Sequence, residues 1–129
     1  MARVRLRPVS VLVVDDLASA RRATSAVVEV ADGFQVEGSV GSGEEAVAFL
    51  ARRPVDLVLM DLSMPGMGGA AASLHIRNHH PDVVVVLLSV CPADQLPIPV
   101  RRPDIGFCGK DRFGPDELEA QWASAAHRR

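Results

Sequence analysis

Short apolar runs recur along the chain and have the character of strands buried on both faces. Residues 9–14, 55–60 and 83–88 form continuous runs rich in β-branched side chains. Such runs are typical of the inner strands of a parallel sheet. Residues 34–40 alternate apolar and polar positions, which predicts a more exposed edge strand, and residues 105–108 form a weaker fifth candidate.

The intervals between these runs carry helical patterns. Ser42 and Glu45 form a capping box, and Pro115 has the place of a first helical residue. Helices are predicted over residues 17–31, 42–53 and 68–80 and from Pro115 onward. The predicted buried face of the first helix comprises Leu17, Ala20, Thr24, Val27 and Ala31. Strand and helix alternate, which predicts an α/β fold with a doubly wound parallel sheet.

One interval departs from this alternation, because residues 92–103 hold four prolines in twelve positions. A proline inside a helix costs about 3 kcal/mol or more. We therefore predict a loop with at most one helical turn where a fourth helix would otherwise lie. Its apolar residues Leu96, Ile98 and Val100 predict that the segment packs against the domain as an extended strap.

Composition places the chain among ordinary globular proteins. Of its 129 residues, 48% are hydrophobic and 23% charged, and the net charge is -2. This favours one domain over residues 1–129 and no polyanionic partner, although the first seven residues, MARVRLR, are locally basic. The longest apolar stretch is too short to span a bilayer, and no signal peptide is visible. We expect a soluble cytoplasmic protein without a membrane partner.

Polar side chains stand at the carboxyl ends of the predicted strands, where open parallel sheets bind their ligands. Asp15 and Asp16 follow the first strand and Asp61 the third. Ser89 ends the fourth strand, and Lys110 follows the fifth. Any one of these residues could be a helix cap, a turn residue or a solvated side chain. Their occurrence together, in this order, predicts a functional site.

Three neighbouring carboxylates repel one another and need a cation to neutralise them. Lys110 supplies one positive charge, and a hard divalent ion such as Mg²⁺ could supply the rest, because it takes carboxylate ligands and keeps waters for a phosphate. A carboxylate beside Mg²⁺ and a lysine is a plausible nucleophile towards phosphorus. Phosphoryl transfer needs mainly positioning and neutralisation of charge, and both are available here.

The chain resembles the receiver domain of two-component response regulators. The resemblance rests on VLVVDDLASARR, VLMDLSMPGMGG, VVVVLLS and GFCGK, and it runs from about Val9 to about Ala126. It implies a flavodoxin-like fold, similar to chemotaxis regulators, with five strands in the order 2-1-3-4-5. The proline-rich segment departs from the family, since it shortens or replaces the fourth helix.

The resemblance also implies a role for each acidic residue. Asp61 would accept a phosphoryl group from the phosphohistidine of a sensor histidine kinase or of a phosphotransfer protein. Asp16, Asp61 and the backbone carbonyl of Ser63 would bind Mg²⁺ directly, and Asp15 would act through water. Beyond its own phosphorylation and dephosphorylation, such a domain catalyses nothing.

Three further residues have roles implied by the same resemblance. Lys110 would pair with Asp61 and then with the phosphoryl oxygens. Ser89 would move towards the phosphoryl group and hydrogen-bond it, and Phe107 would then turn inward. These movements would change the interaction surface of the protein, with homodimer formation left open and DNA binding expected only if an output domain exists outside this chain.

Other readings remain open at this stage. An atypical receiver would act as a phosphate-independent protein-interaction module, which the proline-rich segment favours and the complete acidic set opposes. An aspartyl phosphatase on a similar sheet would carry a second aspartate at the position of Ser63. A flavin-binding protein would need a phosphate-cradling loop after the first strand, where DDLASA places carboxylates instead.

Overall fold

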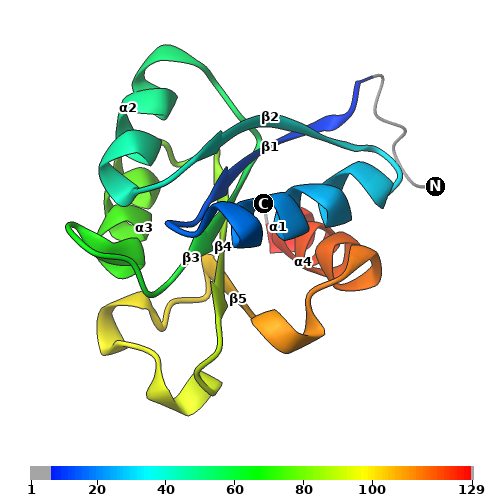
Figure 1. Ribbon diagram of the computed structural model, residues 1–129. Coiled ribbons are helices and arrows are strands. Elements are labelled where there is room, and N and C mark those ends of the chain that lie inside the picture. Colours follow the sequence, from blue (N-terminus) through cyan, green and yellow to red (C-terminus); the bar gives the residue numbers. More distant parts are fainter. Residues whose placement is uncertain (1–6, 129) are drawn as a thin grey trace.

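The protein is a five-stranded parallel sheet with helices on both faces, seen in a computed structural model that describes residues 7–128, with side chains through residue 125 (Figure 1). The strands are β1 (Val9–Val14), β2 (Phe34–Val40), β3 (Leu57–Asp61), β4 (Val84–Ser89) and β5 (Ile105–Gly109). Their order is β2-β1-β3-β4-β5, and every neighbouring pair is parallel. The predicted fold and strand order are therefore confirmed, with β2 at an edge as its alternating pattern predicts.

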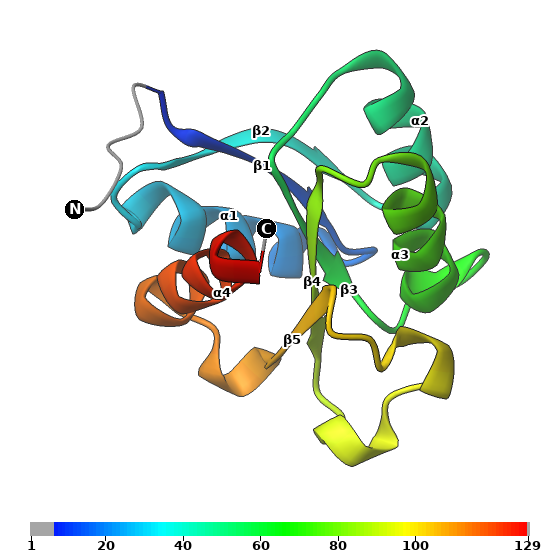
Figure 2. The same cartoon turned by 180° about the vertical axis from the view of Figure 1, so that it is seen from behind.

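Four α-helices cover the sheet: α1 (Ala18–Val30), α2 (Gly43–Arg52), α3 (Gly68–His79) and α4 (Pro115–Arg128). Figure 1 and the reverse view in Figure 2 show α1 and α4 on one face and α2 and α3 on the other. The first six residues, which hold most of the basic MARVRLR stretch, lie outside the described residues.

Two apolar layers form the core, one on each face of the sheet. Leu12, Met60 and Leu87 belong to the layer that also holds the buried side chains of α2 and α3. The alternate residues of the same strands, such as Val13, Leu59 and Val86, pack with those of α1 and α4. Continuous apolar runs are therefore needed in the inner strands, because successive side chains point to opposite and equally buried faces.

The first helix differs in detail from the prediction. Val28 is the fully buried residue of α1, whereas Leu17 precedes the helix and is exposed. Of the predicted face, Ala31 is buried and Ala20, Thr24 and Val27 are half-buried, so the prediction was wrong for Leu17 and missed Val28. The capping box of α2 is confirmed in its main bond, in which the Glu45 N–H donates to Ser42 Oγ at 3.0 Å. The Glu45 carboxylate reaches one residue further back and accepts from the N–H of Gly41.

The proline-rich strap, residues 92–103, contains no α-helix between β4 and β5, as predicted, but it contains two helical turns rather than one. Both are single 3₁₀ turns, at Ala93–Gln95 and Ile98–Val100, and Leu96 and Pro97 between them are extended. A 3₁₀ turn needs only three residues, so the first turn fits between Pro92 and Pro97, and the second includes Pro99, whose fixed φ suits a turn. The restriction to one turn was wrong for this reason.

The strap packs against the domain through alternate apolar side chains. Leu96 is 7% and Val100 2% exposed, whereas Ile98 is 77% exposed, contrary to its predicted packing role. The second turn lies against α3. Arg101, itself a residue of the strap, links its two turns. Its Nε donates to the carbonyl of Leu96 at 2.8 Å and its Nη2 to the carbonyl of Asp94 at 2.7 Å.

The packing of the strap can be tested with two substitutions two residues apart. Leu96→Ala should lower the free energy of unfolding by about 2 kcal/mol, because it leaves a cavity. Ile98→Ala should change it by less than about 0.5 kcal/mol, since the side chain is exposed. Urea denaturation measures both values. Equal, small effects would show that the strap is not anchored.

The start of α3 lies unusually close to the end of β3. A Cβ atom added at Gly69 would stand 2.1 Å from the carbonyl oxygen of Asp61 and 2.8 Å from the Cα of Leu62. The N–H of Gly69 donates to the carbonyl of Leu62 at 3.2 Å. Glycine at this position therefore lets the helix approach the strand end that carries Asp61.

Gly69→Ala should destabilise the protein by about 3 kcal/mol or more, because backbone atoms on both sides must separate. Gly114→Ala is a suitable control, since its added methyl group meets no atom within 4 Å. It should cost at most about 1 kcal/mol through a weaker helix cap. Thermal or urea unfolding of both variants gives the comparison, and equal losses would contradict the close approach at Gly69.

Candidate functional site

The sheet brings the predicted site residues together at the carboxyl ends of its strands. Asp15 follows β1 directly, Asp61 is the last residue of β3, Ser89 ends β4, and Lys110 follows β5. In a parallel sheet all these ends lie on the same side. The order β2-β1-β3-β4-β5 then places the end of β3 between those of β1 and β4.

The acidic cluster consists of Asp15, Asp16 and Asp61. Each contributes a carboxylate oxygen, and these three oxygens lie within 4.8 Å of one another. Asp15 is 3% and Asp61 5% exposed, whereas Asp16 is exposed to solvent. Lys110 Nζ lies 3.0 Å from Asp15 Oδ2 and 2.9 Å from Asp61 Oδ1. One ammonium group therefore joins two buried carboxylates contributed by different strands.

Asp15 is bonded through every polar group it has. Its N–H donates to the carbonyl of Val40, and its Oδ1 accepts from the N–H of Leu17 at 3.0 Å. Its Oδ2 accepts from Lys110, and its backbone carbonyl accepts from Arg21 Nη1 at 2.7 Å. The contact from Arg21 was missed from the sequence, where its only signal is a place in the first helical turn after the acidic pair.

The electrostatics of the cluster favour an added cation. Burial raises the pKa of Asp61, and the charges of Asp15 and Asp16 raise it further; the hydrogen bond and charge of Lys110 act in the opposite direction but do not compensate. Burial by itself would lower the pKa of Lys110, yet its bonds and charge interactions with Asp61 and Asp15 outweigh burial and raise it. Lys110 is thus held as a cation, and one ammonium is insufficient for three carboxylates.

This donor set fits Mg²⁺. The ion prefers carboxylate and carbonyl oxygens, and it needs only a few protein ligands because it retains several waters. Asp16 is exposed, and Oδ2 of Asp61 makes no hydrogen bond within residues 7–128. Both carboxylates therefore have an oxygen available for a cation, whereas both carboxylate oxygens of Asp15 are already engaged.

The loop between β3 and α3 carries Ser63, which is exposed. Two contacts hold this loop at its ends: the N–H of Leu62 donates to the carbonyl of Leu88 at 3.0 Å, and the N–H of Met67 donates to Glu44 Oε2 at 3.3 Å. Gly66 adopts φ 74°, a conformation that favours glycine. The bond between Glu44 and Met67 is a second contact that the sequence analysis did not predict.

Ser89 ends β4, next to Leu88, which pairs with Asp61, and Phe107 lies in β5. Ser89 is buried, and its Oγ accepts from the N–H of Cys91 at 3.0 Å. Both residues line a hollow of about 360 Å³ together with the first residues of the strap. The carbonyl of Phe107 accepts from Gln121 Nε2 at 2.8 Å, which ties β5 to α4. The two predicted switch residues therefore line one hollow next to the strap.

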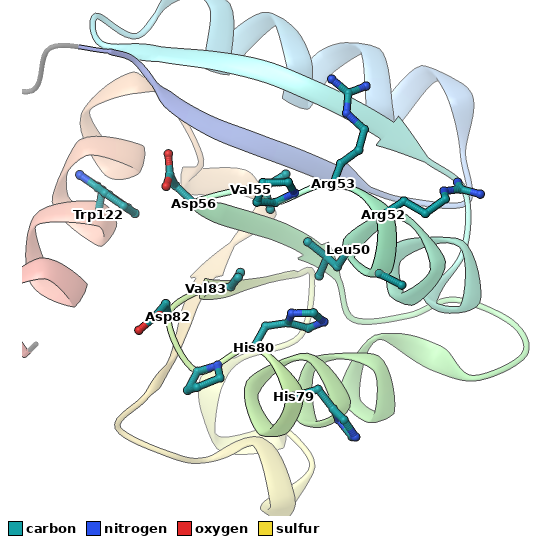
Figure 3. A pocket seen from close by; sticks show the side chains of 13 residues that line it. Leu50, Arg52, Arg53, Val55, Asp56, His79, His80, Asp82, Val83 and Trp122 are labelled. Atoms are coloured by element: carbon teal, nitrogen blue, oxygen red, sulfur yellow. The ribbon is translucent and has the colours of Figure 1, made fainter.

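A wide cleft of about 800 Å³ opens at the opposite end of the sheet, near the amino ends of β3 and β4. Figure 3 shows Asp56, Asp82, His80 and Trp122 around it. None of the residues predicted for the functional site lines this cleft. Within residues 7–128, every helix is too short or too polar to cross a membrane.

Solved structures resemble this fold over nearly its whole length. The response regulator domain of Thermotoga maritima CheB is 26% identical, with a TM-score of 0.78, covering 93% of this chain and 98% of that chain. TrrA from Thermotoga maritima, solved in complex with Mg²⁺-BeF, is also 26% identical, with a TM-score of 0.77 and coverage of 91% and 98%.

Sequence comparison agrees. The response regulator GacA of Pseudomonas viridiflava is 40% identical over 101 residues, which cover 78% of this chain and 46% of GacA. UvrY of Escherichia coli K12 is 38% identical over 92 residues, covering 71% and 42%. The chain thus spans about half the length of the curated relatives it matches. The family model of the response regulator receiver domain matches residues 11–101, and the chain belongs to this family.

Proposed function

We propose that Asp61 is the phosphoacceptor of this receiver domain and that its phosphorylation switches the surface of the protein. The observation that carries the proposal is the position of Asp61. It is a buried carboxylate at the end of a central strand, bonded to Lys110 on one oxygen and placed beside two further carboxylates. A structural aspartate would not need this concentration of charge.

In the proposed reaction, a carboxylate oxygen of Asp61 attacks the phosphorus of a phosphohistidine. The new oxygen–phosphorus bond forms as the phosphorus–nitrogen bond breaks, and the histidine nitrogen leaves with the electron pair. Lys110 compensates the charge of the transferred oxygens from the side of Oδ1. A bound Mg²⁺ would neutralise the remaining charge of the carboxylates and phosphoryl oxygens. Attack of water on the same phosphorus later returns Asp61 and inorganic phosphate.

The proposed ligands of Mg²⁺ are Asp16, Asp61 and the carbonyl oxygen of Ser63, with Asp15 acting through water. The bonds of Asp15 support this division, because Leu17 and Lys110 occupy both of its carboxylate oxygens. Asp16 is exposed and lies within reach of the other two carboxylates. In this arrangement Asp15 mainly holds Lys110 in place.

The proposed switch runs from Asp61 to Ser89 and Phe107. Ser89 would have to give up its bond to the N–H of Cys91 in order to reach a phosphoryl group. Cys91 is the residue before the strap begins, so this change would be transmitted to the segment that replaces the usual fourth helix. Phe107 would follow into the hollow beside Ser89, with Gln121 connecting β5 to α4.

A sensor histidine kinase or phosphotransfer protein is the proposed donor. Receiver domains pair with histidine kinases, and TrrA has been solved in complex with the histidine kinase ThkA. Homodimer formation stays open, and DNA binding would require an output domain outside this chain. A phosphate-independent role has no observation of its own in this site, because the acidic cluster and its lysine are both complete.

Incubation with Mg²⁺ and acetyl phosphate should add the mass of one phosphoryl group to the protein, and Asp61→Asn should abolish the addition. Asp32→Asn, which alters an exposed aspartate between α1 and β2, is the control and should be phosphorylated normally. Intact-protein mass spectrometry gives the result. Undiminished labelling of the Asp61→Asn variant would show that another residue accepts the phosphoryl group.

Asp16→Ala should weaken Mg²⁺ binding about tenfold more than Asp15→Ala, because only Asp16 is proposed to touch the ion. Calorimetric titration is the suitable measurement, since the single tryptophan, Trp122, lines the cleft at the other edge. Losses of equal size would remove the distinction between a direct ligand and one acting through water.

Lys110→Met should uncouple phosphorylation from the switch, because the phosphoryl oxygens lose the cation that holds them. The amide signals of Ser89 and Phe107 should then shift by less than half of the wild-type change on phosphorylation. Arg52→Met, which removes an exposed cation at the other end of the sheet, should leave the shift intact. Nuclear magnetic resonance of nitrogen-labelled protein detects both, and a full shift in the Lys110 variant would refute its role.

A further inference from the structure

We infer that Arg21 is a positioning residue for the metal site: its guanidinium fixes the peptide unit that presents Asp16. The inference rests on the proposed binding of Mg²⁺ by Asp16. It concerns a residue outside the acidic cluster, on α1, whose contact is with the backbone and not with any carboxylate.

Arg21 contacts the peptide unit that joins Asp15 to Asp16. Arg21 Nη1 donates to the carbonyl oxygen of Asp15 at 2.7 Å. This carbonyl and the N–H of Asp16 belong to the same planar peptide unit, so they rotate together. The Cα–Cβ direction of Asp16 depends on that rotation. A bond to the carbonyl of Asp15 therefore orients the side chain of Asp16.

The side chain of Asp16 is not held by hydrogen bonds of its own among the described residues. Its carboxylate is exposed, and it makes no hydrogen bond with the described side chains. The carboxylate of Asp15, by contrast, is already held by Leu17 and Lys110. These bonds fix the Asp15 side chain but leave the following peptide unit free to turn, and Arg21 restrains it.

The local structure favours this position of the guanidinium. Helical side chains lean towards the amino end of their helix, which directs Arg21 back over the turn between β1 and α1. The group is also confined from the other side, because a Cβ atom at Gly41 would stand 3.3 Å from Arg21 Nη1. Gly41 follows β2, whose last residue Val40 accepts from the N–H of Asp15. The guanidinium therefore lies in a gap between two ordered backbone segments.

Charge and positioning predict opposite signs, which makes the inference testable. If Arg21 acted only as a positive charge near the site, its removal would strengthen Mg²⁺ binding by reducing repulsion. If it acts by holding the peptide unit, its removal should weaken binding. Loss of a group that orients a metal ligand typically costs 10- to 100-fold in affinity.

Arg22 provides a matched control. It is the next residue of α1, carries the same charge, is exposed, and makes no hydrogen bond or ion pair with the described residues. Arg21→Met and Arg22→Met both keep an unbranched side chain and good helix propensity while removing the guanidinium. The two variants remove the same charge from neighbouring residues, but only Arg21→Met removes the bond to Asp15.

The experiment is a calorimetric Mg²⁺ titration of the wild-type protein and both variants, after thermal unfolding has shown that each is folded. Arg21→Met should bind Mg²⁺ about tenfold more weakly, and Arg22→Met within about twofold of wild type. Arg21→Lys retains the charge and an ammonium group that can donate hydrogen bonds, but it has a shorter reach and no planar guanidinium, and it should fall between wild type and Arg21→Met. In metal-free protein, the amide signals of Asp16 and Leu17 should move in Arg21→Met and stay in place in Arg22→Met.

A rate measurement separates positioning from general damage. The Mg²⁺ concentration that half-saturates phosphorylation by acetyl phosphate should rise about tenfold in Arg21→Met, while the rate at saturating Mg²⁺ stays close to wild type. Arg21→Met binding Mg²⁺ as tightly as Arg22→Met, or more tightly than Arg21→Lys, would overturn the inference. Absence of Mg²⁺ binding to the wild-type protein would instead overturn the proposed function.

Discussion

The bond of Lys110 to two buried carboxylates is the interaction on which the functional edge depends. Asp15 and Asp61 come from different strands and repel each other, and burial makes both charges costly. A single ammonium within 3.0 Å of each offsets part of that cost. Because Lys110 is the only lysine of the chain, no neighbouring lysine could replace it. The residual negative charge favours the binding of a divalent cation at this end of the sheet.

The loops that follow β1 and β3 are held in place by residues outside the acidic cluster. Arg21 on α1 binds the carbonyl of Asp15, Glu44 on α2 binds the N–H of Met67, and Gly69 lets α3 reach the backbone of Asp61. Each contact lies one step away from the groups proposed to react. The accuracy of the site therefore depends on helices that cover both faces of the sheet, in keeping with the need of transferred phosphoryl groups for precise positioning.

The strap gives this receiver a different surface where a fourth helix would lie. Its prolines exclude an α-helix, yet Leu96, Val100 and Arg101 hold it in a defined conformation. Ser89 leads directly into it, and the N–H of Cys91 is the present partner of Ser89 Oγ. A signal that frees Ser89 would therefore change the beginning of a short, tethered segment, whereas the rotation of a helix is not available here.

Much of this protein could be predicted from its sequence, because the relevant signals are local. Buried runs, the capping box and clustered prolines act over a few residues, and they determined the strands, the helices and the absence of an α-helix between β4 and β5. The order of carboxylates at strand ends indicated the acidic edge, since parallel strands share one direction. Only the tertiary structure decided that Lys110 bonds both Asp15 and Asp61, that Ser89 faces the strap, that Ile98 is exposed, and that Arg21 reaches the carbonyl of Asp15. These contacts depend on how helices and strands distant in the chain are placed against one another, and no pattern within a short stretch of sequence specifies that placement.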